Sequence, residues 1–317
     1  GGAGFINGAV TVASGGTIAP GNSPGALATG NLNLNSGATY QVEFGPTTDI
    51  LNVTGTVNLN ADLGVGATLA GVSLPGFVPV TGGSYTIIDN NGTLDAVSGT
   101  FAQGASLTVN GVPFSINYAG GDGNDVVLTI QAPTTVYVDD DWTAMALGAQ
   151  ITDADPIAVG NQPAYFGYNA FAAVNSGITA VAASGTVVVN AGDNGNYATE
   201  AVNINKTLTM NLQQGPLAFG SLNDSVTTAT VNLNGITLTT GGDNSSTQFD
   251  SGINGSGGLT KTGTGRLILA GANGFNGLTD VVNGQLQAAH ALALGTIFGG
   301  THVTAGARLE LAGGITV

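Results

Sequence analysis

The chain has 317 residues, of which 42% are hydrophobic and 7% are charged, and this composition excludes an intrinsically disordered acidic tail. Four basic and nineteen acidic side chains give a net charge of −15, so binding to nucleic acid is not expected. The 53 glycines follow no Gly-X-Y period, which excludes collagen, and no apolar run of about 18 residues predicts a membrane span.

Residues 1–130 form a first region in which short candidate strands alternate with glycine turns. Apolar residues recur at every second position in residues 40–44 and 51–54. This alternation turns one face of each strand inward and leaves Thr and Asn outside. The rhythm fits a sandwich or a solenoid, so periodicity alone predicts only a β-rich segment.

Residues 136–257 form a second region, which contains the one persuasive helix, near residues 170–183. Phe171, Val174, Ile178 and Val181 recur at helical spacing and make one apolar stripe. Candidate strands then follow at intervals of about 20 residues, as expected of a solenoid. The pattern predicts the first coils of a β-helix, with the helix covering one open end of the core.

Residues 258–317 form a third region that repeats a simpler phrase. Residues 281–286 and 303–311 share a β pair, then Asn-Gly or Ala-Gly, then Leu and another strand. The glycine supplies the positive φ or the close backbone approach that a tight corner requires. The phrase predicts that the β-helix continues to residue 317.

The stretch from Gly258 to Leu286 closely resembles the autotransporter-associated β-strand repeat. It reads Gly-Leu-Thr-Lys-Thr-Gly-x-Gly-x-Leu-x-Leu-x-Gly-x-Asn and later Val-x-x-Gly-x-Leu. It departs from the pattern at residues 274–277, where the family usually shows a Tyr-Thr-Gly turn. The phrases at residues 19–25, 49–55 and 118–128 look like the non-repetitive β segments of the same passenger proteins.

Residues 136–206 are similar to the initial coils of pectin-lyase-like β-helices in large bacterial surface proteins. Together these resemblances imply an all-β, right-handed parallel β-helix with one short capping helix, in which the first region is also β-helical. They further imply an exported passenger at the surface of a Gram-negative-type bacterium.

One phrase suggests a calcium site. Residues 120–127, Gly-Gly-Asp-Gly-Asn-Asp-Val-Val, fit the calcium nonapeptide of β-roll proteins, which makes Asp122 and Asp125 candidate ligands. That site is shared between consecutive repeats, whereas the phrase occurs once, so a glycine-rich turn is the favoured alternative. The acidic groups at residues 139–141 and at Asp153 and Asp155 are interpreted as solvated loop charges.

Catalysis is the rival to a structural role, because pectin-lyase-like folds include lyases and glycosidases. A lyase would draw its base from four cations, and a hydrolase needs two carboxylates about 5–10 Å apart. A shared fold does not carry function with it, so no catalytic residue is assigned. The candidates weighed are Lys206, Lys261, Arg266 and Arg308 for a lyase, and Asp243 and Asp250 for a hydrolase.

Other side chains give weaker signals. His290 and His302 are 12 residues apart, which is not a metal-binding spacing. Trp142, Tyr165 and Tyr168 could stack on a sugar, but aromatic residues that cover a cap or a domain joint are the commoner case.

The sequence therefore predicts an extracellular structural or adhesive scaffold, a stalk, without catalysis and without a required cofactor. Two alternatives stay open: a self-assembling filament or sheath subunit, and a polysaccharide lyase or hydrolase. The expected partners are a host or neighbouring-cell surface, glycans, or copies of the chain itself.

Overall fold

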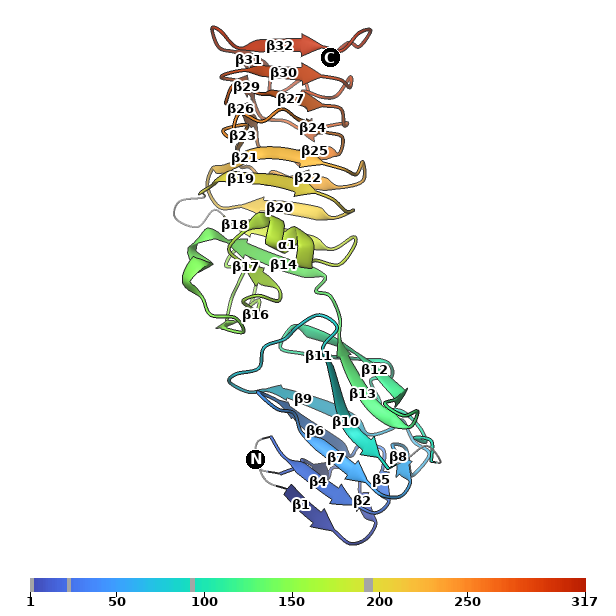
Figure 1. Ribbon diagram of the computed structural model, residues 1–317. Helices are drawn as coiled ribbons and strands as arrows, with labels where there is room; N and C mark the ends of the chain where they lie inside the picture. Colours follow the sequence, from blue (N-terminus) through green and yellow to red (C-terminus); the bar gives the residue numbers. More distant parts are fainter. Residues whose placement is uncertain (1–2, 22–23, 92–94, 191–195) are drawn as a thin grey trace. The chain divides into compact units, whose positions relative to one another are not determined.

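The computed structural model describes residues 3–21, 24–91, 95–190 and 196–317 (Figure 1). The chain is all-β with about 14 solenoid turns, and parallel sheets dominate. Its internal contacts define two compact units. Unit 1 comprises Gly1–Ala132 and Leu147–Gln150, and unit 2 comprises Pro133–Ala146 and Ile151–Val317.

Unit 1 begins as a three-faced parallel β-helix. Its strands alternate in burial, so that Tyr40, Val42 and Phe44 point into the core while the residues between them are partly exposed. The three faces are β1 (Ala3–Ile6), β4 (Ala26–Thr29) and β7 (Ile50–Val53); β2 (Val10–Val12), β5 (Leu32–Leu34) and β8 (Val57–Asn58); and β3 (Thr17–Ile18), β6 (Thr39–Phe44) and β9 (Thr68–Ser73).

The end of unit 1 is antiparallel. Strand β10 (Ser84–Asn90) pairs in parallel with β7 and antiparallel with β13 (Asp125–Ile130). Strands β12 (Val112–Gly120) and β11 (Ser106–Val109) continue this meander. The sequence pattern did not reveal the change of direction, because a period of two is common to parallel and antiparallel strands.

Aromatic side chains fill the core of unit 1 around Phe44. The centre of its ring lies 5.7 Å from that of Phe77, 5.5 Å from that of Tyr85 and 5.0 Å from that of Phe114. Phe44, Phe77 and Phe114 are at most 1% exposed. The parallel coils and the antiparallel meander therefore share one aromatic core.

Unit 2 is a longer parallel solenoid with three main faces. The first is β17 (Ala170–Phe171), β14 (Thr135–Asp139), β18 (Thr186–Asn190), β20 (Thr209–Gln213), β22 (Thr230–Asn232), β25 (Gly252–Gly255) and β28 (Gly274–Phe275). The second is β19 (Asn196–Ile204), β21 (Leu217–Asp224), β23 (Leu238–Thr240), β26 (Leu259–Lys261), β29 (Thr279–Val281) and β31 (Thr301–Val303). The third is β24 (Thr247–Phe249), β27 (Arg266–Leu269), β30 (Gln285–Ala288) and β32 (Arg308–Leu311).

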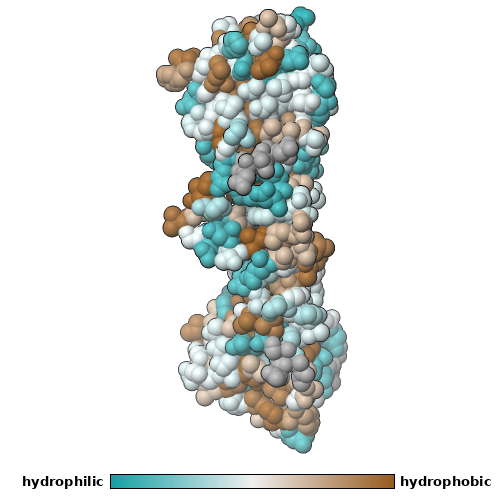
Figure 2. Space-filling model, turned by 90° about the vertical axis from the view of Figure 1, so that its left-hand side faces the viewer, coloured by the Kyte–Doolittle hydropathy of each residue, from teal (hydrophilic) through white to brown (hydrophobic). Residues whose placement is uncertain are grey.

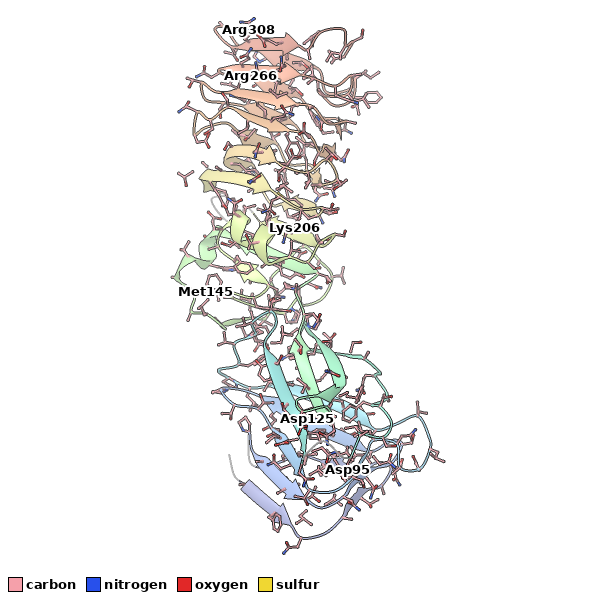
Figure 3. The ribbon with its side chains drawn as sticks, turned by 45° about the vertical axis from the view of Figure 1, so that its right-hand side comes forward. Asp95, Asp125, Met145, Lys206, Arg266 and Arg308 are labelled. Atoms are coloured by element: carbon pink, nitrogen blue, oxygen red, sulfur yellow. The ribbon has the colours of Figure 1, made fainter. Side chains whose placement is uncertain are left out.

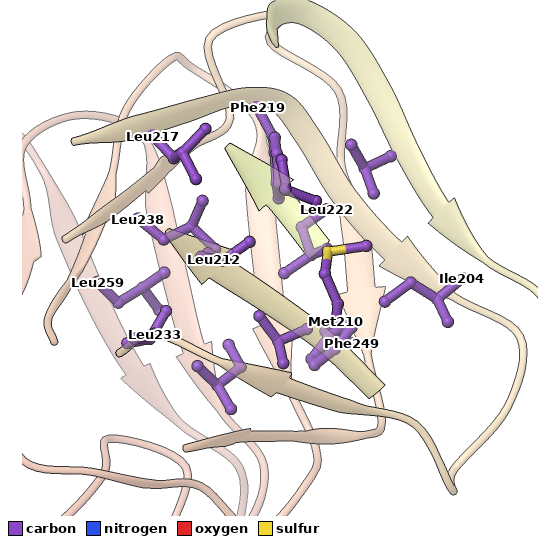
Figure 4. Close-up of a cluster of buried hydrophobic side chains, with 14 of the residues drawn as sticks. Ile204, Met210, Leu212, Leu217, Phe219, Leu222, Leu233, Leu238, Phe249 and Leu259 are labelled. Atoms are coloured by element: carbon purple, nitrogen blue, oxygen red, sulfur yellow. The ribbon is translucent and has the colours of Figure 1, made fainter. Parts of the chain in front are cut away.

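Successive coils of unit 2 place equivalent residues directly above one another. Leu238 pairs with Leu259, which pairs with Thr279, and all three are fully buried. On the first face Met210 pairs with Val231 and Val231 with Ile253, and these residues are also fully buried. The inward columns join into one hydrophobic core, part of which is shown in Figure 4.

A short helix, α1 (Val174–Ala180), packs onto this core. Val174 and Ile178 are at most 1% exposed and join the core cluster of the coils. The helix lies so close that a Cβ at Gly177 would come within 2.7 Å of Val138 Cγ2. It is shorter than the stripe predicted near residues 170–183, because Phe171 belongs to β17. The expected capping helix is confirmed.

An excursion between β14 and α1 covers part of the outer face of the first sheet. It contains the 3₁₀ helix η1 (Asp140–Ala144) and the strand pair β15 (Gln150–Ile151) and β16 (Ala164–Tyr165). Ala154 and Ala164 pack there against Tyr137 and Val188, which point outward from β14 and β18. In the described residues, no helix has the length and apolar character needed to cross a membrane.

Candidate functional site

The calcium phrase lies in the hairpin between β12 and β13. Asp125 pairs with Gly120 across the antiparallel ladder and is 8% exposed, while Asp122 is exposed in the turn. One carboxylate oxygen of Asp125 accepts a hydrogen bond from the backbone N–H of Asn90 at 2.9 Å. Burial raises the pKa of the Asp125 carboxyl; this hydrogen bond opposes the shift, and the charges of Asp89 and Asp122 add to it.

The carboxylate of Asp125 has a structural role at this corner. A Cβ at Gly121 would lie 1.7 Å from Asp125 Oδ2, so the turn requires glycine there. The side-chain amides of Asn90 and Asn124 both donate to the carbonyl of Asp95, at 2.7 and 3.2 Å. Both predicted ligands thus come from one antiparallel hairpin rather than from stacked parallel turns, and calcium binding by them stays a prediction.

The structure brings a different acidic group together at the end of β14. One ligand atom from each of Asp139, Asp140 and Asp141 lies within 4.8 Å of the other two, the only such trio of potential metal ligands among the described residues. Asp139 caps η1 by accepting a hydrogen bond from the backbone N–H of Asp141 at 3.0 Å. The carboxylate of Asp139 therefore has a structural use as the cap of η1.

Asp153 and Asp155 shape the excursion loop. Asp153 Oδ1 accepts from the backbone N–H groups of Asp155 and Gln162, at 3.3 and 3.2 Å. Asp155 is 7% exposed and accepts from the N–H groups of Ile157 and Ala158. Each carboxylate accepts hydrogen bonds from backbone N–H groups of its own loop, so both have a structural role.

The two carboxylates proposed for a hydrolase have separate partners. Burial alone would raise the pKa of Asp243, but hydrogen bonds from Ser221 and Ser245 and the charge of Lys261 outweigh it and lower that pKa. Asp250 instead accepts a hydrogen bond from the side chain of Gln248 at 2.7 Å. The different partners of Asp243 and Asp250 in the structure give no indication that this pair acts together.

The carboxylate that interacts with Asp250 is Asp224, which sequence reasoning did not single out. It is 7% exposed, and its two oxygens accept from the backbone N–H groups of Asp250 and Ser251, both at 2.8 Å. Burial raises the pKa of Asp224; hydrogen bonds from Ser251 and Asp250 oppose the shift, and the charge of Asp250 adds to it. Both oxygens hold the corner of the next coil.

Lys261 is the unexpected residue of the repeat, because it is 1% exposed. Its ammonium donates to the carbonyls of Thr262, Gly263 and Asn283, the last two at 3.1 and 3.4 Å. Burial lowers the pKa of Lys261, and the charge of Asp243 opposes the shift. The ammonium closes corners of two successive coils. Lys261 stands two positions after the inward Leu259 in the same strand. This alternation was the signal in the sequence that the side chain points inward.

The other cations lie elsewhere in unit 2. Lys206 donates to the carbonyls of Thr179 and Val181 at 3.0 and 2.9 Å, at the C-terminal end of α1, where a positive charge is favourable. Arg266 and Arg308 lie toward the C-terminal end of the solenoid, away from Lys206 (Figure 3). Lys206 therefore lies apart from the two arginines.

The histidines and aromatic residues also have separate places. His302 lies 2.8 Å from Asp280, whereas His290 accepts from the N–H of Leu292 at 3.0 Å. Tyr165 and Tyr168 are 3% exposed and cannot offer a ring face to a sugar. The visible surface in Figure 2 shows hydrophobic side chains in separate groups among polar ones.

Comparison with known proteins identifies one segment. Residues 259–288 match the family model of the passenger-associated-transport repeat. This segment runs from β26 to β30 and contains Lys261. The resemblance seen in residues 258–286 is confirmed by the match and by the solenoid that surrounds it. No curated protein and no solved structure matches the chain.

Proposed function

Because the chain carries a passenger-associated-transport repeat within a β-solenoid, as autotransporter passengers do, we propose that it serves at a bacterial cell surface as a structural or adhesive scaffold without catalysis. The proposed setting is the outer membrane surface of a Gram-negative-type cell. The proposed partners are a host or neighbouring-cell surface, glycans, or copies of the chain itself.

The stacked inner columns of unit 2 are the observation that carries this proposal. Leu238, Leu259 and Thr279 repeat one buried position on three consecutive coils. In such a stack each coil is stabilised by its neighbours, so stability grows with the number of coils rather than with a central domain core. This form suits a scaffold that spans distance outside the cell.

The outer surface of unit 2 also fits a scaffold. Asn232 donates to Asn211 at 2.9 Å, and Asn223 donates to Asn203 at 3.1 Å, each across adjacent coils. Amides that bind one another along the stack stiffen it and need no partner. The chain has four Lys and Arg residues, and Lys261 is buried, so trypsin has few accessible sites.

Surface display tests the proposal. The chain would be fused to an autotransporter barrel in a Gram-negative host, and intact cells would be treated with trypsin and with a broad protease. We expect unit 2 to resist both proteases. Leu259→Asp, which places a charge in a fully buried column, should remove that resistance.

Three further measurements separate the candidate functions. Adhesion of the displaying cells to host cells and to glycan arrays reports an adhesive role. Sedimentation of the purified chain reports self-assembly, and fibres would favour the filament alternative. Release of unsaturated or reducing sugars from a polysaccharide panel would contradict the scaffold proposal and support a lyase or hydrolase.

A further inference from the structure

The repeat at residues 259–288 contains three Asn-Gly pairs, and the structure holds each of them differently. In such a pair the backbone nitrogen of the glycine can attack the side-chain carbonyl carbon of the asparagine, because glycine has no Cβ to hinder the approach. The rate in a folded chain depends on whether these two groups are held together or apart. The pairs are Asn273–Gly274, Asn276–Gly277 and Asn283–Gly284.

Hydrogen bonds across the coils hold the first two pairs. Asn273 is 2% exposed; its side-chain oxygen accepts from the backbone N–H of Ile253 at 2.8 Å, and its side-chain nitrogen donates to the carbonyl of Ala293 at 2.6 Å. Gly277 donates its backbone N–H to the carbonyl of Gly257 at 2.9 Å. The side-chain amide is therefore fixed in the first pair, and the attacking nitrogen is fixed in the second.

The third pair has its reacting groups in contact. Asn283 is exposed in the corner between β29 and β30, and the backbone nitrogen of Gly284 lies 2.7 Å from Asn283 Oδ1. The carbon under attack, Cγ, is bonded to this oxygen. The corner also requires glycine at position 284, since its φ is +67° and a Cβ there would lie 2.4 Å from the carbonyl oxygen of Gly263. The fold thus places an unhindered nitrogen against an exposed side-chain amide.

We propose that Asn283 is a site of spontaneous deamidation in the folded chain. The nitrogen of Gly284 loses its proton and bonds to Asn283 Cγ, the bond from Cγ to Nδ2 breaks, and Nδ2 leaves as ammonia with the released proton. Water then opens the succinimide ring at one of its two carbonyl carbons. Opening at Cγ gives aspartate with a normal backbone, whereas opening at the former backbone carbonyl gives isoaspartate, in which the chain runs through Cβ and Cγ.

The isoaspartate product changes the contacts of this corner with both neighbouring coils. The carbonyl of Asn283 accepts from Lys261 Nζ at 3.4 Å, and the carbonyl of Gly284 accepts from the N–H of Arg308 at 2.9 Å. In isoaspartate the first carbonyl becomes a free carboxylate beside Lys261, and the longer backbone displaces the second from Arg308. This inference does not depend on the proposed scaffold function.

Peptide mapping of the aged whole chain tests the proposal. The folded chain would be kept at mildly alkaline pH in isotope-labelled water, digested with pepsin at acid pH and read by mass spectrometry. Oxygen taken from the labelled water marks conversion during ageing and not during digestion. We expect Asn283 to be converted about tenfold faster, or more, than Asn273 and Asn276, because its reacting groups are already in contact.

The same chain unfolded in urea is the matched control. There the three pairs should react at similar rates, because the coils no longer hold them differently. Asn283→Gln should remove the signal at this position, since ring closure through a longer side chain is slow. The proposal is wrong if Asn283 in the folded chain keeps its amide as long as Asn273 does, or if Asn276 reacts as fast as Asn283.

Hydrogen exchange tests the effect on the corner. In the aged chain, exchange at residues 303–311 should be faster than in the fresh chain, because the isoaspartate releases the N–H of Arg308. Asn283→Asp carries the same charge with a normal backbone and should exchange as the fresh chain does. Equal exchange in the aged chain and in Asn283→Asp would contradict the proposed change of the corner.

Discussion

Units 1 and 2 both coil parallel strands around an apolar core, but they differ in the regularity of their coils. In unit 1 Thr39 pairs with Thr17 and with Thr68, so two successive coils take 22 and 29 residues. In unit 2 Leu259 pairs with Leu238 and with Thr279, so two successive coils take 21 and 20 residues. A constant coil length keeps aliphatic residues in columns, whereas unequal coils leave spaces that large aromatic rings fill.

The units also differ in how charged groups close their corners. Unit 1 contains no Lys or Arg, and Asp49 holds its corner by accepting from the N–H groups of Gly25 and Glu43 at 2.6 and 3.0 Å. Unit 2 uses Asp224 in the same way and adds the buried ammonium of Lys261. A carboxylate satisfies donors and an ammonium satisfies acceptors, so unit 2 can fix both kinds of backbone group.

The largest expected effect is a loss of stability in the aromatic core of unit 1. Phe44→Ala should lower the free energy of unfolding of unit 1 by about 3–5 kcal/mol, because it removes a fully buried ring that contacts three others. Hydrogen exchange read by mass spectrometry across a urea series would follow each unit separately. Unit 2 should keep its midpoint.

The matched change in unit 2 is Leu259→Ala. It removes one member of a buried column and should lower the stability of unit 2 by about 2–5 kcal/mol, with unit 1 unaffected. If either variant shifts both midpoints equally, the two units unfold as one, and the distinction between them has no thermodynamic meaning.

Much of this architecture could be predicted from sequence, because alternation and coil length are local signals. The inward positions of β6 and the capping role of Val174 and Ile178 follow from periods of two and 3.6 residues. Alternation did not reveal the antiparallel meander, but part of it had a local signal: Asn110 and Gly111, both at positive φ, form the two-residue turn that joins β11 to β12.

Lys261 is a different case. The alternation of its strand indicated an inward position, but lysine is a residue type that is normally placed outside. It stands two positions after the inward Leu259, so alternation alone predicts that it points into the core. Lysine is rarely fully buried, and general expectation therefore places it outside. The carbonyls of Thr262, Gly263 and Asn283 make the burial possible.

A smaller effect tests the difference between the two units in the charged groups that close their corners. Lys261→Met keeps the volume but removes the donor from three carbonyls, and it should cost unit 2 about 1–3 kcal/mol at pH 7. Urea unfolding of unit 2 measures this loss. Unit 1, which has no such residue, is the internal control.

The pH dependence of the same variant gives an independent check. The folded pKa of Lys261 lies below its unfolded value, so the proton is bound more weakly in the folded state. Loss of the proton therefore favours folding, and the contribution of this group to stability rises as pH increases from the folded toward the unfolded pKa. The difference in the free energy of unfolding of unit 2 between the wild type and Lys261→Met should grow over that pH range. A flat difference would contradict a lowered pKa of Lys261 in the folded state.

The smallest expected effect concerns the outer amides. Asn232 donates to Asn211 across adjacent coils of unit 2 at 2.9 Å, and Asn232→Ala should cost about 0.5–1 kcal/mol. In unit 1 Asn33 pairs in register with Asn58, yet the oxygen of Asn58 accepts from the N–H of Asn60 at 3.0 Å instead. Asn33→Ala should therefore have a smaller effect. Urea midpoints of the two variants measure the difference, and equal losses would show that the amide contact of unit 2 adds no stability of its own.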